Sequence, residues 1–290
     1  AANGQTVTLL KDIVLESAIV IAKDQNVTID LGSFDITLTS TIMGESMITN
    51  YGVLTINGNE DAVINYNYVG EADPSYGYGN YTINNLGTLT VNGGKITIAN
   101  LRAHAKYPIN NYSLFGDAVL VINGGHLYNY NTSAIRQICS TGGKNIITIN
   151  GGLIEGYCAI WVQNPGKSTV HAELNINGGE IRTTAAAYVN GTAALKDVSS
   201  SLYFTLSDAN GAWTSDSVVN ITGGTFNENV NLVDDAPKAI IGADAIFNGN
   251  LNHIHSFGDW TQTKAPSCTG KGELKRVCDC GYAETQEVAA

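Results

Sequence analysis

The sequence predicts an all-β fold made of stacked repeats, because one short phrase recurs along the chain. The phrase holds two aliphatic residues around a central residue, then a polar turn residue and, in most copies, Gly-Gly. The polar turn residues are Asp30, Asn57, Asn92, Asn123, Asn150, Asn177 and Thr222. Their basic interval of about 27 residues, with longer insertions, is typical of a solenoid whose repeats stack on one another.

Each phrase predicts two short strands. Aliphatic residues alternate with a central residue that is usually polar, as in Leu54-Thr55-Ile56, and this period of two indicates a half-buried strand. Gly-Gly then ends the strand, because only glycine adopts positive φ freely. A second short strand follows, with one inward apolar residue per repeat. Its expected inward residues are Ile96, Leu127, Ile154, Ile181 and Phe226.

A third strand can be aligned in the same way. Its segments are Ile48–Asn50, Ile83–Asn85, Ile109–Asn111, Ile135–Gln137 and Ile160–Val162, and we expect residues 187–189 to continue the column. Three short strands per turn of about 27 residues resemble the right-handed single-stranded parallel β-helix of pectin-lyase-like proteins. The resemblance covers residues 1–250 and implies about eight turns, each burying its apolar face against the next. It concerns the fold and says little about function.

The repeats also predict two columns of stacked side-chain amides. One follows the polar turn residues from Asn57 to Asn177, and the other runs through Asn50, Asn85, Asn111 and Gln137. At the strand spacing of roughly 4.8 Å, each amide can bond to the amides above and below it. We interpret both columns as structural.

Composition limits the classes of partner. The formal net charge of −11 argues against nucleic-acid binding, which needs a basic surface. No apolar run is long enough to span a bilayer as a helix, so no membrane insertion is expected. The chain begins Ala-Ala-Asn-Gly, which suits a trimmed N-terminus. The resemblance to secreted β-helix proteins, together with this start, implies a bacterial protein that is secreted or displayed on the cell surface.

Residues 251–290 differ in composition and predict a small, separate Cys/His module. Its candidate metal ligands are His253, His255, Cys268, Cys278 and Cys280. A module of this size usually needs a staple, and thiolates with imidazole suit tetrahedral zinc. The stretch resembles a short repeat near the C-termini of surface proteins of anaerobic gut Firmicutes, but with one residue fewer between its last two cysteines. Structural zinc, a disulfide and reduced cysteines all remain open.

The third strand's outer face is the candidate ligand surface. We expect Arg136, Trp161 and Tyr188 to bind a ligand there, together with Tyr128 on the second strand and a tyrosine-rich insertion at residues 65–81. Exposed aromatic rings on a rigid sheet suit sugar rings, and an arginine can bond hydroxyls or carboxylates. The alternative is that an insertion at residues 186–215 covers this face.

Catalysis is the second interpretation. Lyases and hydrolases of the resembled fold use calcium-binding carboxylates with a basic residue, or sets of paired aspartates. The single Asp-Asp, at residues 234–235, lacks such partner motifs, and Glu155 beside Arg182 predicts a cross-strand ion pair. We therefore expect a non-catalytic protein that binds a glycan or another host or cell-surface polymer. A polysaccharide lyase or glycoside hydrolase and a purely structural spacer or fibre are the alternatives.

Overall fold

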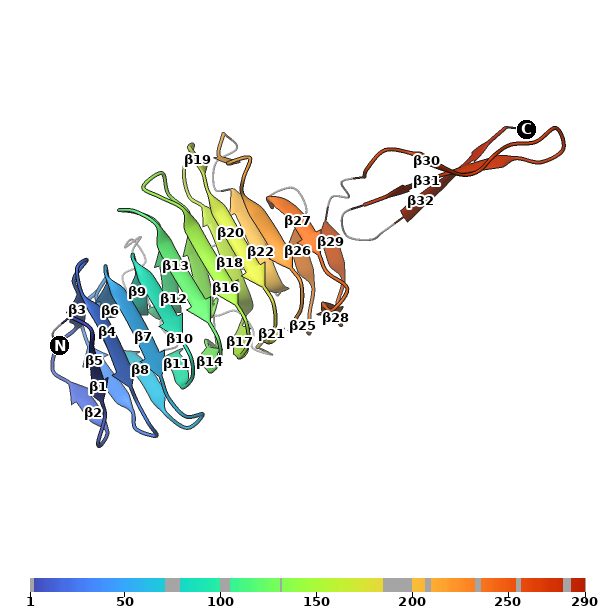
Figure 1. Ribbon diagram of the computed structural model, residues 1–290. Helices are drawn as coiled ribbons and strands as arrows, with labels where there is room; N and C mark the ends of the chain where they lie inside the picture. Colours follow the sequence, from blue (N-terminus) through green and yellow to red (C-terminus); the bar gives the residue numbers. More distant parts are fainter. Residues whose placement is uncertain are drawn as a thin grey trace.

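The chain is an all-β parallel β-helix followed by a small antiparallel sheet. The computed structural model describes residues 3–70, 79–99, 105–130, 132–184, 200–206, 210–232, 236–253, 257–278 and 283–289, and every element in these segments is a β-strand. Figure 1 shows an elongated stack of strands, with the C-terminal sheet projecting beyond its last turn. No helix in the described segments is long and apolar enough to cross a membrane.

Three sheets of nine strands each run along the stack, and we name them sheets A, B and C. Sheet A consists of β1 (Gln5–Thr8), β4 (Asn26–Asp30), β7 (Val53–Asn57), β10 (Thr88–Val91), β13 (Ala118–Ile122), β16 (Asn145–Ile149), β20 (Ala172–Ile176), β24 (Val218–Ile221) and β27 (Lys238–Ile241). Sheet B consists of β2 (Ile13–Leu15), β5 (Ile36–Ser40), β8 (Val63–Tyr68), β11 (Lys95–Ile98), β14 (His126–Tyr128), β17 (Leu153–Gly156), β21 (Glu180–Thr183), β25 (Thr225–Phe226) and β28 (Ile246–Phe247). Sheet C consists of β3 (Ile19–Ile21), β6 (Ser46–Asn50), β9 (Asn80–Asn85), β12 (Ala105–Tyr112), β15 (Ile135–Ile138), β18 (Cys158–Asn164), β22 (Ser200–Leu206), β26 (Val230–Leu232) and β29 (Leu251–His253).

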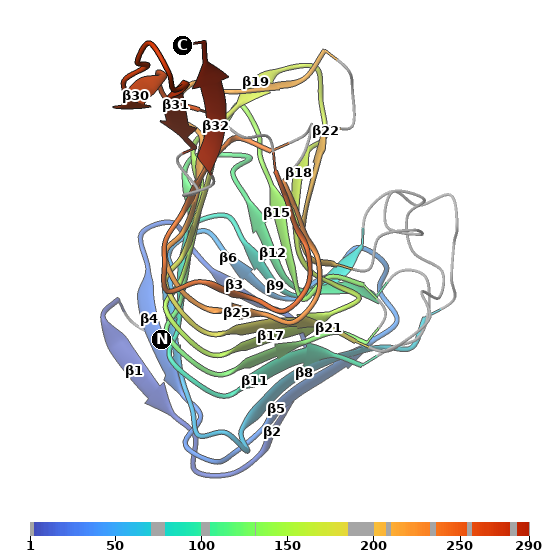
Figure 2. The ribbon, with the colours of Figure 1, turned by 90° about the vertical axis from the view of Figure 1, so that its right-hand side faces the viewer.

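The chain visits the three sheets in turn, so each strand pairs in parallel with its equivalent one turn away. Figure 2 looks along the stack and shows the sheets as walls around the interior. A separate pair, β19 (Thr169–Val170) and β23 (Ala212–Trp213), extends from the stack. The C-terminal antiparallel sheet consists of β30 (Thr261–Lys264), β31 (Gly272–Val277) and β32 (Ala283–Val288). The predicted parallel β-helix is therefore confirmed.

The interior is filled by columns of apolar side chains that the strand register aligns. In sheet C, for example, Ile48, Ile83, Ile109, Ile135 and Ile160 are successive partners, and each is 0% exposed. Burying one such side chain contributes about 1.5–3 kcal/mol relative to leaving it exposed. The stack is therefore stabilised by a core shared between neighbouring turns.

The two glycines of the recurring phrase meet different needs, as the copy in the turn between β10 and β11 shows. Gly94 has φ of +79°, a conformation that favours glycine. Gly93 instead lies against the turn beneath, where a Cβ would stand 2.2 Å from the Gly58 carbonyl oxygen. The first glycine thus allows neighbouring turns to approach, and the second lets the chain change direction.

The predicted amide column at the corner between sheets A and B is present. Asn92 Nδ2 donates to Asn57 Oδ1 across 2.8 Å. The same bond, at 2.8 to 2.9 Å, continues through Asn123, Asn150 and Asn177. The hydroxyl of Thr222 then donates to Asn177 Oδ1. This ladder lies at the surface, and it confirms the structural interpretation.

The second column is buried, and one of its predicted members is replaced. Asn50 donates to Asn85, Asn85 to Asn111, and Asn111 to the side chain of Asn145 in sheet A. Gln137 instead donates to the backbone carbonyl of Asn145. Gln137 also donates to the backbone carbonyl of Glu173.

Residues 187–189, the expected continuation of the third-strand column, lie outside the described residues, and another strand holds the position after β18. The strand that pairs with β18 is β22, which places Tyr203 beside Trp161. Tyr188 therefore does not hold that position in the column, and its own location lies outside the described residues. A long insertion between β21 and β22 displaced the strand from the basic period. The expected surface insertion at residues 65–81 is partly wrong. Its first residues belong to strand β8, in which Tyr66 and Tyr68 are buried.

The end of the β-helix lies slightly beyond the predicted boundary at residue 250. Strand β29 pairs with β26 and includes His253. This histidine therefore belongs to the last strand of sheet C. The antiparallel sheet begins at Thr261.

Candidate functional site

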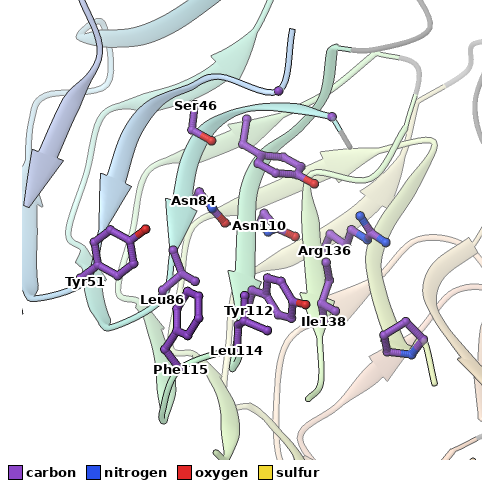
Figure 3. A pocket seen from close by; sticks show the side chains of 14 residues that line it. Ser46, Tyr51, Asn84, Leu86, Asn110, Tyr112, Leu114, Phe115, Arg136 and Ile138 are labelled. Carbon is purple, nitrogen blue, oxygen red and sulfur yellow. Dashed lines mark hydrogen bonds between the residues drawn. The ribbon is translucent and has the colours of Figure 1, made fainter. Parts of the chain in front are cut away.

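The candidate site is a groove of about 380 Å³ on the outer face of sheet C. Figure 3 shows its side chains, with aromatic and aliphatic groups gathered at one end and amides nearer the centre. The described lining consists of Gly44, Ser46, Tyr51, Gly79, Tyr81, Asn84, Leu86, Asn110, Tyr112, Leu114, Phe115, Arg136, Ile138 and Pro165. We call this the sheet C groove.

Strand register places the polar part of the groove. Asn84, Asn110 and Arg136 are successive partners in β9, β12 and β15, one residue after the inward isoleucines. Because side chains alternate between the two faces of a strand, all three face outward. Tyr112 and Ile138 pair two residues further on and face the same way.

The apolar end comes from turns between sheets C and A. Tyr51 follows β6, and Leu114 and Phe115 follow β12. The Tyr51 and Phe115 rings lie 6.4 Å apart between centroids, and Phe115 is 67% exposed. An apolar group of this kind on a surface commonly marks an interaction site.

The central amides form a short ladder with an unused acceptor. Asn110 Nδ2 donates to Asn84 Oδ1 across 2.8 Å. The Asn110 side chain is 1% exposed, and its Oδ1 has no hydrogen-bond partner within the structure described. A buried polar atom without a partner is costly, and this oxygen lies out of contact with solvent in the floor of the groove.

Arg136 is held by three neighbours. Its guanidinium carbon lies 5.3 Å from the ring centre of Tyr107 and 5.0 Å from that of Trp161. Gln163 Oε1 accepts hydrogen bonds from Nε and Nη2 of the same guanidinium. The stacking and the two bonds fix the orientation of this cation at the edge of the groove.

Trp161 is not the exposed platform that the sequence suggested. Its side chain is 1% exposed and packs with Tyr81, Tyr107 and Cys158, with Tyr203 against the same cluster. Strand β22 pairs beside β18 in sheet C and brings Tyr203 against this cluster, so Trp161 is buried within the sheet's own side chains. The ring contributes by supporting Arg136.

Tyr128 lies on sheet B and does not line the sheet C groove. It is partly buried, with Lys95 Nζ 4.7 Å from its ring centre. On the next two strands, Glu155 Oε2 lies 3.2 Å from Arg182 Nη2 and 3.0 Å from His126 Nε2. The predicted Glu155–Arg182 ion pair is therefore present. Tyr188, the fourth predicted ligand residue, falls outside the described residues.

The predicted zinc site can be followed only in part. Cys268 is exposed and Cys278 is buried, and both are free thiols. The described segments contain no group of three or more metal-ligating side chains. His255, Cys280 and the side chain of His253 fall outside the described residues. Two thiols suit zinc chemistry but do not complete a tetrahedral set. The zinc site stays a prediction.

The remaining cysteines behave as buried apolar residues. Cys139 and Cys158 are 0% exposed and unpaired. Burial raises the pKa of Cys158 to about 12, and burial also raises the pKa of Cys139. Both thiols are therefore protonated and unreactive at neutral pH.

The fold defines the class of this protein as a parallel β-helix. Comparison with protein-family models, curated proteins and solved structures gives no match. Function must therefore be argued from the site itself.

Sequence reasoning found Arg136 but missed the apolar end of the groove. Tyr51, Leu114 and Phe115 lie in turns, where the alternation of a strand does not indicate which way a side chain faces. A signal was present in Leu114-Phe115-Gly116, because two large apolar residues beside a turn glycine have no place in the core pattern.

Proposed function

We propose that this protein binds a glycan, without catalysis, through the sheet C groove. The observation that carries the proposal is the exposed Tyr51–Phe115 pair, in turns at the edge of sheet C, beside the Asn84–Asn110 amides of that sheet. Its role would be adhesion or glycan recognition by a secreted or cell-surface protein.

The two parts of the groove match the two kinds of surface on a sugar. Aromatic side chains offer flat apolar area for the C–H face of a pyranose ring, as at many protein interfaces. Asn84, Asn110 and Arg136 supply the polar part of the lining. A mostly apolar groove with a few fixed polar groups is the usual form of a small-ligand site.

The lining favours binding over hydrolysis. Glycoside hydrolysis generally needs two carboxyl groups on either side of the scissile bond. The described residues that line the groove include neither Asp nor Glu. Glu155 and Glu180, which pair with Arg182, belong to sheet B.

The test is a glycan-array screen with wild type, Phe115→Ala and Leu10→Ala. Phe115 and Leu10 are 67% and 85% exposed, so neither change should lower the unfolding midpoint appreciably. We expect Phe115→Ala to weaken binding about tenfold or more, since aromatic anchors dominate many binding sites. Leu10→Ala, in the first turn, should bind as wild type does.

Two outcomes contradict the proposal. Equal binding by wild type and Phe115→Ala would move the ligand to another surface. Absence of glycan binding by every sample would favour the structural spacer.

A further inference from the structure

We propose that the sheet C groove selects glycans that carry an anionic group, a carboxylate or a sulfate ester, and that Arg136 binds this group. The inference rests on the proposed glycan binding and adds the chemical class of the ligand. Two features support it: the charge of the groove and the geometry of one guanidinium.

The charge of the groove is opposite to that of the chain. The sequence has 26 acidic and 15 basic residues. Among the described residues that line the groove, Arg136 is the one charged side chain. Electrostatic complementarity governs which ligands are accepted, so a local cation in an acidic protein favours an anion at this point.

Arg136 does not form an ion pair with any described carboxylate. By contrast, Arg182 and Arg276 are each paired with a glutamate. Within the described structure, no carboxylate therefore neutralises the charge of the Arg136 guanidinium. Its partners Gln163, Tyr107 and Trp161 carry no formal charge.

The geometry leaves hydrogen-bonding capacity for a ligand. A guanidinium carries five N–H donors in a planar fork. Gln163 accepts one bond from Nε and one from Nη2 of Arg136. The remaining donors suit the two oxygens of a carboxylate or the oxygens of a sulfate, and such charge-assisted bonds are about twice as strong as neutral ones.

Each part of the ligand can therefore be assigned to one part of the groove. Its anionic group lies at Arg136, and an apolar sugar face lies toward Tyr51 and Phe115. All of these groups line one groove. A neutral glycan would satisfy only the second of these contacts.

The experiment compares one oligosaccharide backbone in neutral, carboxylated and sulfated forms, after a glycan array has identified a backbone that binds. Wild type, Arg136→Gln, Arg136→Lys and Arg182→Gln are titrated with each form. Arg182→Gln is the control, because it removes a cation from sheet B. We expect wild type to bind an anionic form about tenfold more tightly than the neutral one.

Arg136→Gln should abolish this preference, so that the variant binds the anionic and neutral forms with similar affinity. Arg136→Lys should keep part of it, because lysine retains the charge without the planar fork. The carboxylated and sulfated arms show which anion is preferred. Equal affinity of wild type for all three forms would overturn the inference while leaving glycan binding intact.

A second measurement does not depend on any variant. Raising the salt concentration from 0.05 to about 0.5 M should weaken wild-type binding of the anionic form more than that of the neutral form. Equal salt dependence would also overturn the inference. If the array shows no bound glycan of any kind, the proposed function fails, and this inference fails with it.

Discussion

Asn111 donates through Nδ2 to Asn145 Oδ1 across 2.6 Å, and this bond joins sheet C to sheet A through the interior. Asn111 also accepts from Asn85, and Asn145 Nδ2 donates to the Asn111 backbone carbonyl. All three amides are 0% exposed. The buried ladder therefore supports both the stacking of turns and the corner between two sheets.

Removal of the Asn111 amide should be strongly destabilising. Asn111→Ala leaves buried groups of Asn85 and Asn145 without their partner, at about 1–3 kcal/mol for each group. We expect a loss of about 3 kcal/mol or more, measured by chemical denaturation. The control is Asn123→Ala in the surface ladder, where water can replace the amide and the loss should stay within about 1 kcal/mol. Equal losses would show that burial does not distinguish the two ladders.

The first glycine of the phrase should tolerate no side chain. A Cβ at Gly93 would stand 2.2 Å from the backbone oxygen of Gly58 in the preceding turn. Gly93→Ala should therefore cost several times the roughly 1–2 kcal/mol of a left-handed conformation alone. Gly4→Ala is the matched control, because φ is +76° and nothing lies within 4 Å of the added carbon. A Gly93→Ala protein as stable as Gly4→Ala would mean that the turns can separate freely.

The recurring phrase made sheet A predictable. Its alternation fixes which side chains face inward, and a slip of one residue would reverse every face. Sheet C was harder to predict, because the residue that pairs with Trp161 is Tyr203 and not Tyr188, and a long insertion separates the two strands in sequence. The entropic cost of closing a loop rises slowly with length, so an insertion can displace a strand without disturbing the core. Spacing alone therefore could not locate β22.

The candidate site was predictable only where it lies on strands. Arg136 was assigned to the outer face because Ile135 before it faces inward. The burial of Trp161 depends on Tyr81, Tyr107 and Tyr203, which come from three other strands. Contacts between distant segments leave no local pattern in a sequence.

His126 should make the fold sensitive to mild acid. Burial lowers the pKa of His126 below its usual value, and the Glu155 carboxylate offsets this only in part, with Lys95 and Arg182 adding repulsion. The unfolded chain then binds a proton at a higher pH than the folded chain does. This contribution to stability is present above about pH 6.5 and is lost as pH falls through the lower folded pKa.

The measurement is the free energy of unfolding of wild type and His126→Asn between pH 7.5 and 5. The variant should lose less stability than wild type across this range, because it lacks the group that must be protonated. Carboxylates titrate in both proteins, so the difference between them isolates His126. A wild type that loses no more than the variant would contradict the sign argued here.

Cysteine labelling should test the zinc prediction for the C-terminal module. Cys268 is exposed, whereas Cys139 and Cys158 are buried in the β-helix. In folded, metal-free protein, iodoacetamide should modify Cys268 and spare the two buried thiols, as mapped by mass spectrometry. Zinc should slow modification of Cys268 about tenfold or more, because a coordinated thiolate is a weaker nucleophile.

EDTA should restore the labelling of Cys268, and metal analysis should then find about one zinc ion released per chain. Cys139 and Cys158 serve as internal controls, since they should be modified only after the β-helix is unfolded. Cys268→Ser should lower the amount of bound zinc without changing the unfolding midpoint of the β-helix. Equal labelling of Cys268 with and without zinc would exclude it as a ligand, and the small module would then be held by its antiparallel sheet and the stacking of Arg276 on Phe257 and Trp260.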